Sequence, residues 1–201
     1  VYRTQSQPYD QAGNLVRILD IISGRRLDKH IYRNACSHRD YFESILPGVL
    51  REYVACARAI QQLHEAGFRH GDIRRDHILV EYETGMFRWI DFDYEFYLPE
   101  RPFALDLLEL GNMLMFLVAR GNYHPREIVD EPSLGEKVLA TIEPEDYSLL
   151  SKNRVVNLRK LYPYIPPEMN NIFMHFSQGA SVWYDTVEEL VDDVEKVVAV
   201  L

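Results

Sequence analysis

The strongest pattern of apolar and polar positions along the chain is helical. Apolar side chains recur at intervals of three and four between Val49 and Ala66, and Gly67 follows where a helix C-cap is expected. Residues Leu105–Arg120 are apolar almost all round, which is typical of a buried helix. A last helix is predicted after Thr186, where Thr186-Val187-Glu188-Glu189 forms a capping box. The chain is therefore predicted to be mainly helical.

Shorter stretches with a regular pattern lie around these three helices. Apolar spacing and capping residues predict additional short helices over residues 27–35, 37–46, 125–129, 135–142, 145–151 and 167–177. Two short apolar runs, Ile78–Tyr82 and Phe87–Ile90, flank a turn that contains Gly85 and predict a β-hairpin. A second hairpin is expected within residues 1–23, and Ser23–Arg26 break its pattern and are interpreted as a hinge. The fold class expected from this pattern is α+β, mainly α-helical.

Composition and charge narrow the classes of function. The chain has 201 residues, 47% of them hydrophobic, which is enough for one packed core. Its 22 basic and 31 acidic side chains give a net charge of −9, which argues against a general nucleic-acid or anionic-membrane surface. The apolar stretch Leu105–Ala119 contains Asp106, Glu109 and Asn112 and is too short to span a bilayer, so no membrane span is expected. The two cysteines do not suggest a disulfide framework and favour a cytoplasmic location.

The candidate catalytic and metal-binding residues lie between His70 and Asp93, in the sequence HGDIRRDHILVEYETGMFRWIDFD. Asp72 lies in the loop before the first strand of the predicted hairpin, and Asp91 follows the second strand. A hairpin of this length brings the two carboxylates to one place. Metal-assisted phosphoryl transfer needs such a pair, because one acid orients the acceptor and the other holds a divalent cation.

This stretch resembles the protein-kinase-like superfamily, in which a loop of the form H-x-D-x-x-x-x-N precedes a short hairpin and a D-F-G sequence. The matching residues are HGDIRRDH, HILVEY and WIDFD, and the sequence DLLELG from Asp106 is similar to the D-x-x-S-L-G of protein kinases. The end of the chain, from Pro166, is similar to the closing helix pair of a kinase. The resemblance covers roughly residues 15–201. It implies a kinase-like C-terminal lobe with a short catalytic β-hairpin over residues 24–201, and a remnant N-terminal hairpin and hinge over residues 1–23.

The resemblance implies a role for each residue at the centre of this lobe. Asp72 would orient and deprotonate the acceptor hydroxyl, and Arg74 would steady the transferring phosphate. Asp91 would bind a Mg²⁺ ion that bridges the phosphates of ATP. Leu79 would lie under the adenine ring, and Asp20 belongs to a segment that resembles the hinge beside that ring.

Five further positions complete this comparison. Two are expected to support the loop, two depart from the family pattern, and one is given no role in the site. The resemblance implies that His70 packs behind the loop and that Asp106 caps and braces it. His77 stands where Asn would hold a second Mg²⁺, so it is either a metal ligand or a hydrogen-bonded structural histidine. Asp93 stands where Gly is usual, as a further metal ligand or an exposed turn acid. Arg75 is interpreted as a solvated loop charge, and for Arg74 that interpretation stays open beside the contact with the phosphate.

The resemblance leaves two functions open. The first is an ATP- and Mg²⁺-dependent phosphotransferase similar to Ser/Thr protein kinases, whose acceptor is a protein or a small hydroxyl compound. Fourteen residues separate Asp91 from Asp106, which favours a small acceptor, and I-D-F-D also occurs in bacterial sugar and lipopolysaccharide-core kinases of this superfamily. The C-terminal helices favour the protein-kinase branch. The second function is a catalytically impaired pseudokinase that acts as a binding or scaffolding module.

The half of a kinase site that cradles the phosphates has no match in the sequence. No G-x-G-x-x-G precedes residue 20, and no V-A-I-K lysine is present. In kinases the glycine-rich loop covers the nucleotide phosphates and this lysine contacts them. That half of the site is therefore expected to lie largely outside these 201 residues.

Overall fold

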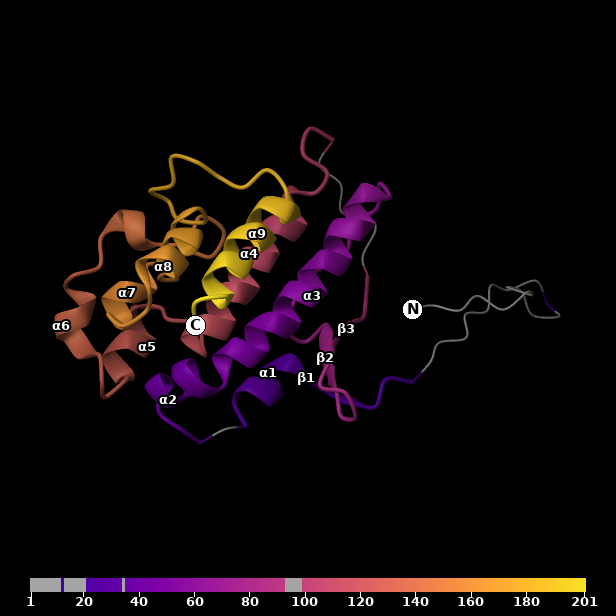
Figure 1. Ribbon diagram of the computed structural model, residues 1–201. Helices are drawn as coiled ribbons and strands as arrows, with labels where there is room; N and C mark the ends of the chain where they lie inside the picture. The colour runs from indigo at the N-terminus through magenta and orange to yellow at the C-terminus, as the bar shows by residue number, and fades with distance from the viewer. Residues whose placement is uncertain (1–11, 13–20, 34, 93–98) are drawn as a thin grey trace.

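The computed structural model describes residue 12 and residues 21–33, 35–92 and 99–201 of the chain. The fold is α+β, with a small antiparallel sheet beside a larger set of helices (Figure 1). The hairpin predicted over residues 1–23 lies almost entirely outside the described residues. The described elements, in chain order, are β1 (Gly24–Arg26), α1 (Leu27–Ile31), α2 (His38–Ser44), α3 (Leu46–Glu65), β2 (Ile78–Glu81), β3 (Phe87–Trp89), α4 (Ala104–Ala119), α5 (Pro125–Asp130), α6 (Gly135–Leu139), η1 (Pro144–Asp146), α7 (Leu158–Leu161), α8 (Pro167–Met174) and α9 (Val187–Val198).

Helix α3 is the centre of the helical part and packs against both α4 and α9 (Figure 1). Its buried side chains, among them Leu50, Tyr53 and Ala57, recur at intervals of three and four, so one face of the helix turns inward. The Tyr53 hydroxyl donates to the carbonyl oxygen of Leu110 on α4 at 3.1 Å. Helix α3 is thereby fixed against α4, and the loop that leads to β2 starts from this fixed support.

Strand β2 lies between β1 and β3, and both pairings are antiparallel. Three of the residues interpreted as a hinge, Gly24–Arg26, form strand β1, and Gly24 pairs with Glu81. Close pairing needs glycine there, since a Cβ on Gly24 would lie 2.8 Å from the carbonyl oxygen of Val80. The hinge itself stays a prediction. Trp89 of β3 ties the sheet to α3 through a 2.9 Å hydrogen bond from its indole N–H to a backbone carbonyl of that helix. The sheet thus fixes the far end of the loop between α3 and β2.

The helix predicted over residues 145–151 was wrong. The chain forms only the short 3₁₀ turn η1 and then extends along two isolated β-bridges. The Ser148 hydroxyl accepts the N–H groups of Leu150 and Ser151 at 3.2 and 3.0 Å. Such local bonds to a side chain compete with the hydrogen bonds of a helix. The bends and the turn that follow bring Arg154 into contact with α4.

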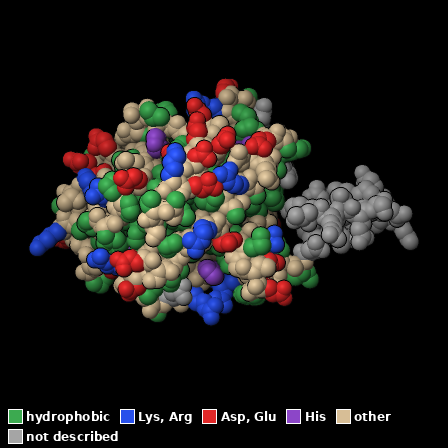
Figure 2. All heavy atoms as spheres, viewed as in Figure 1, with side chains coloured by type: hydrophobic (Ala, Val, Ile, Leu, Met, Phe, Trp, Pro, Cys, Tyr) green, Lys and Arg blue, Asp and Glu red, His purple; other side chains and the backbone are tan. Residues whose placement is uncertain are grey.

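The surface of the described part mixes both signs of charge. In Figure 2, acidic and basic side chains are interspersed over the face in view, with hydrophobic side chains between them. Both cysteines are free thiols, and Cys56 is buried whereas Cys36 is partly exposed. Within the described chain, no helix combines the length and the apolar character that crossing a membrane requires.

Candidate active site

The first residues of the loop between α3 and β2 are held by a carboxylate on α4. Asp106 is 1% exposed, and its oxygens accept the backbone N–H groups of His70 and Gly71 at 2.7 and 2.8 Å. Burial acts to raise the pKa of Asp106, but hydrogen bonds from His64 and from the loop hold the pKa below its ordinary value. The carboxylate is therefore ionised at neutral pH. The brace expected at Asp106 is confirmed, and it fixes the backbone directly before Asp72.

His64 on α3 is a third partner of this carboxylate. Its Nε2 atom lies 2.9 Å from Oδ2 of Asp106, and its ring stacks on that of Phe103 with 4.2 Å between centroids. The sequence analysis missed this contact because 42 residues separate the two partners. No short pattern joins positions that far apart, and only the packing of α3 on α4 brings them together.

The His70 ring connects the braced loop to the hairpin. The side chain is fully buried between the rings of Trp89 and Phe92, with centroid distances of 4.9 and 4.4 Å. Burial lowers the pKa of His70, so the ring is neutral at physiological pH. The packing role expected for His70 is confirmed. Because Trp89 and Phe92 flank Asp91 in the chain, the same contacts tie the second acid to the loop that carries Asp72.

Asp91 follows β3 as an exposed residue with a positive φ of 56°. A non-glycine residue in this left-handed region stores backbone strain, and such residues concentrate at functional sites. The strand pairing continues one step beyond β3, because the N–H of Ile90 donates to the carbonyl oxygen of His77 at 3.0 Å. Asp91 therefore leaves the sheet beside the end of the loop.

Three of the predicted site residues gather on the loop itself. The Nδ1 atom of His77 lies 3.0 Å from the backbone oxygen of Asp72 and 3.3 Å from its carboxylate. The Arg74 guanidinium lies 4.0 Å from the same carboxylate, and the Asp72 side chain is 33% exposed. Arg74 also pairs with Asp76 through two bonds of 3.1 and 2.9 Å. The sequence analysis did not assign Asp76, although its position two residues after Arg74 on a turning loop makes such a pair possible.

The oxygen ligands of the site suit Mg²⁺ better than the histidine does. Mg²⁺ takes carboxylate, phosphate and water oxygens, and one or two protein carboxylates are sufficient. Asp91 has that chemistry, whereas His77 directs Nδ1 at Asp72 and offers a nitrogen. In the described part of the chain, no group of three or more His, Cys, Asp or Glu residues is placed to share a metal ion. Asp93 lies outside the described residues, so the metal ligands stay predictions.

Only one of the two expected adenine contacts lies in the described chain. Leu79 is half-buried in β2, on the face of the sheet opposite Ile78 and Val80. A half-buried leucine on a strand can contact a flat ring. Asp20 lies outside the described residues, so both nucleotide contacts stay predictions.

Glu109 is a site residue that the sequence analysis did not assign. Its Oε2 atom accepts the backbone N–H of Ile73, the residue after Asp72, at 2.7 Å. Burial raises the pKa of Glu109 to about 7. Asp106, Glu109 and Asn112 recur at intervals of three in an otherwise apolar helix. This polar stripe is the signal that could have identified the face of α4 that meets the loop.

The loop, the hairpin and α4 thus bring four predicted residues into one region. Asp72, Arg74 and His77 lie on the loop, and Asp91 leaves the sheet next to its end. The braced backbone before Asp72 is the best-defined part of the site. No protein-family model matches the sequence, and no curated protein matches it either.

Proposed function

We propose that this chain is the metal-and-base half of an ATP- and Mg²⁺-dependent phosphotransferase, with a fold similar to the C-terminal lobe of protein kinases. The proposed acceptor is a hydroxyl group. One observation carries the proposal: the buried Asp106 carboxylate holds two consecutive amides directly before Asp72, while His70 ties this loop to the residues around Asp91. The chain segments that carry the two acids are thereby fixed before any ligand binds, which supports the preorganisation that phosphoryl transfer requires.

Each residue has a role in the proposed transfer. Asp72 takes the proton of the acceptor hydroxyl as its oxygen attacks the terminal phosphorus of ATP, and ADP leaves. Asp91 would hold a Mg²⁺ ion, which would supply positive charge against the nucleotide phosphates. Arg74 brings positive charge to the transferring phosphoryl group. His77 orients Asp72 through its contacts to the backbone and the carboxylate of that residue, which is a positioning role.

Nucleotide binding with matched aspartate variants tests the metal half of the proposal. Mg²⁺ with ATP is titrated calorimetrically into the wild-type chain, Asp91→Asn and Asp130→Asn. Asp130 is an exposed α5 residue that pairs with Arg126, so it controls for the loss of one surface carboxylate. We expect wild type and Asp130→Asn to bind alike, and Asp91→Asn to bind about tenfold more weakly or worse. If neither wild type nor Asp130→Asn binds the nucleotide, the proposal fails.

Turnover tests the base separately from the metal ligand. ADP release from Mg²⁺ and ATP, with water as the phosphoryl acceptor, is followed for wild type and for Asp72→Asn. A general base contributes about a hundredfold or more, so we expect Asp72→Asn to release ADP at least that much more slowly while it binds the nucleotide like wild type. Release at the wild-type rate from Asp72→Asn would show that this residue is not the base.

A second candidate function is a pseudokinase that binds nucleotide or a partner without turnover. One observation favours it: His77 stands where the family has a metal ligand, and its Nδ1 atom is directed at Asp72. This candidate predicts nucleotide binding with no ADP release that depends on Asp72. His77→Asn then distinguishes the causes, because restored release would locate the impairment at this position.

A further inference from the structure

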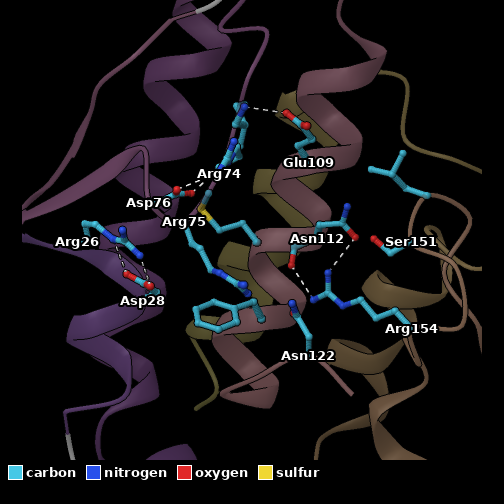
Figure 3. Close-up of a pocket in the computed structure, with 14 residues that line it drawn as sticks. Arg26, Asp28, Arg74, Arg75, Asp76, Glu109, Asn112, Asn122, Ser151 and Arg154 are labelled. Carbon is cyan, nitrogen blue, oxygen red and sulfur yellow. Dashed lines mark hydrogen bonds and ion pairs between the residues drawn. The ribbon is translucent and has the colours of Figure 1, made fainter. Parts of the chain in front are cut away.

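A cavity of about 430 Å³ opens beside the loop. Its walls are the junction of β1 and α1, loop residues 73–76, the second half of α4 and the segment around Arg154 (Figure 3). A volume of this size suits a small molecule. Ile73 and Arg74, the two residues after Asp72, form part of the wall, so the cavity begins next to the proposed base.

Two of the arginines that line the cavity are neutralised by neighbouring carboxylates. Arg26 makes bonds of 3.1 and 2.6 Å to the two carboxylate oxygens of Asp28. Arg74 binds Asp76 in the same bidentate way. Such fork-to-fork pairs satisfy both partners. These two pairs therefore bring little unbalanced charge to the cavity.

Arg154 lies in the wall without a compensating charge from the described residues. Its side chain donates from Nη1 and Nη2 to the side-chain and backbone oxygens of Asn112 at 3.2 and 2.9 Å, and both acceptors are neutral. The residue is 5% exposed, and burial lowers its pKa to about 10, so it remains charged at neutral pH. A buried charge is unfavourable until an opposite charge pairs with it. Arg154 is therefore suited to pairing with an anion in the cavity.

Arg75 enters the same space from the loop. Its guanidinium lies 4.9 Å from the centroid of the Phe116 ring, and within the described chain it forms no ion pair. Figure 3 shows Arg75 and Arg154 reaching into the cavity from opposite sides, and Asn122 and Ser151 also line it. The buried Asn122 amide oxygen has no hydrogen-bond partner among the described residues. Rotation of that amide would present its N–H₂ group as a donor.

We propose that this cavity binds an anionic group and that a phosphate monoester matches it best. Two guanidinium groups without partner carboxylates balance the two negative charges of a phosphate monoester and bond well with its oxygens. Resting on the proposed function, the acceptor is then a small hydroxyl compound that already carries a phosphate. Its hydroxyl would lie at Asp72 and its phosphate between Arg75 and Arg154. Arg75 is exposed, as expected for a loop charge, and the proposal adds a binding role for it.

Inorganic phosphate is the probe, in the absence of ATP and Mg²⁺. Thermal unfolding of wild type, Arg75→Gln, Arg154→Met and Arg126→Gln is followed in phosphate and in sodium chloride of equal ionic strength. Arg126 is the control, because it is exposed and pairs with Asp130 on α5. At about ten times the dissociation constant, we expect phosphate to raise the Tm of wild type and Arg126→Gln by about 3–5 °C. The two cavity variants should bind phosphate about tenfold more weakly.

Several outcomes would overturn the proposal. An equal rise of Tm in phosphate and chloride would mean ionic screening only. An undiminished phosphate response in Arg75→Gln would place the anion elsewhere, and this variant leaves the bonds of Arg154 intact, so it guards against misfolding of Arg154→Met. If phosphate binds in the cavity while Mg²⁺ with ATP does not bind to wild type, the proposed function fails and the anion site stands. Nucleotide binding without phosphate binding would remove the anion site alone.

Discussion

The two ends of the polar stripe on α4 differ in how their charges are compensated. At one end, the buried Asp106 carboxylate is bonded by His64 and by two backbone amides of the loop. At the other end, Asn112 holds the buried Arg154 through neutral oxygens only. Glu109 lies between them, with one amide bond and a pKa raised to about 7 by burial. The compensated end fixes the backbone of the loop, whereas the other end keeps a charge available for a ligand.

The largest effect is expected at the compensated end. Asp106→Ala leaves the buried N–H groups of His70 and Gly71 without their acceptor and removes the partner of His64. Hydrogen bonds to a charged group contribute about 1.5–3 kcal/mol each, so the free energy of unfolding should fall by about 3 kcal/mol or more in urea. Asp130→Ala, on the surface of α5, should change it by less than about 0.5 kcal/mol. A loss as small as that in Asp106→Ala would show that the loop keeps its place without the brace.

The middle of the stripe is tested by the dependence of stability on pH, because Glu109 titrates there. Burial raises its pKa from 4.5 to about 7 in the folded chain, so the folded state binds a proton that the unfolded state releases at lower pH. By linkage, the stability from this group is highest below about pH 4.5 and declines as pH rises towards 7, because the ionised form is unfavourable in the fold. Glu109→Gln keeps an acceptor for Ile73 and abolishes the titration. At pH 8 it should be more stable than wild type by about 1–2 kcal/mol, a value reduced for solvent screening.

Urea unfolding at pH 5 and pH 8 measures this difference. Glu136→Gln is the control, because Glu136 is an exposed residue of α6. It should keep the wild-type dependence on pH. If Glu109→Gln also keeps the wild-type dependence of stability on pH, that dependence belongs to another group. The charge of Glu109 would then be compensated in the fold, as that of Asp106 is.

A smaller loss of stability is expected at the end that holds Arg154. Arg154→Met removes two hydrogen bonds to Asn112, but it also removes a buried charge that no described residue pairs. These effects oppose each other, and apolar replacement of buried charges is often close to neutral. Urea unfolding should therefore show a loss of about 1 kcal/mol or less. A loss equal to that of Asp106→Ala would make Arg154 a structural brace and would remove the contrast between the two ends.

The parts of this contrast that could be predicted from the sequence are local. Apolar spacing and Gly67 define α3, and the turn at Gly85 joins the two strands that carry the loop to Asp91. The brace at Asp106 came from resemblance, because its bonds to residues 70 and 71 span 36 and 35 residues of sequence. No periodicity relates positions that far apart. The sequence shows Asp106, Glu109 and Asn112 within an apolar helix, but it was not recognised that they share the face that meets the loop.

The remaining parts depend on contacts between distant segments. His64 meets Asp106, and Arg154 meets Asn112, each across 42 residues. No periodicity relates such pairs, because only the packing of α3 and of the segment after η1 against α4 brings them together. Strand β1 was missed for the same reason. It is three residues long and gains its backbone partners only by pairing with β2.

The smallest effect is expected at the ion pair that neutralises Arg74. The side chains of Arg74 and Asp76 are 54% and 29% exposed, and ion pairs at the surface contribute little to stability. Asp76→Asn should therefore change the free energy of unfolding by less than about 0.5 kcal/mol. On the proposed function it also releases Arg74 for the nucleotide phosphates. The affinity of Asp76→Asn for Mg²⁺ with ATP, measured by calorimetry, should then equal that of wild type or exceed it by up to about threefold.

The same titration on Arg74→Gln separates the released charge from a change in the loop. Arg74→Gln removes the guanidinium that approaches both Asp72 and Asp76, so it should bind the nucleotide more weakly while Asp76→Asn does not. Weaker binding in both variants would mean that the pair itself shapes the loop. In that case the pair would act like the brace at Asp106, and the charge left available at this site would be confined to Arg75 and Arg154.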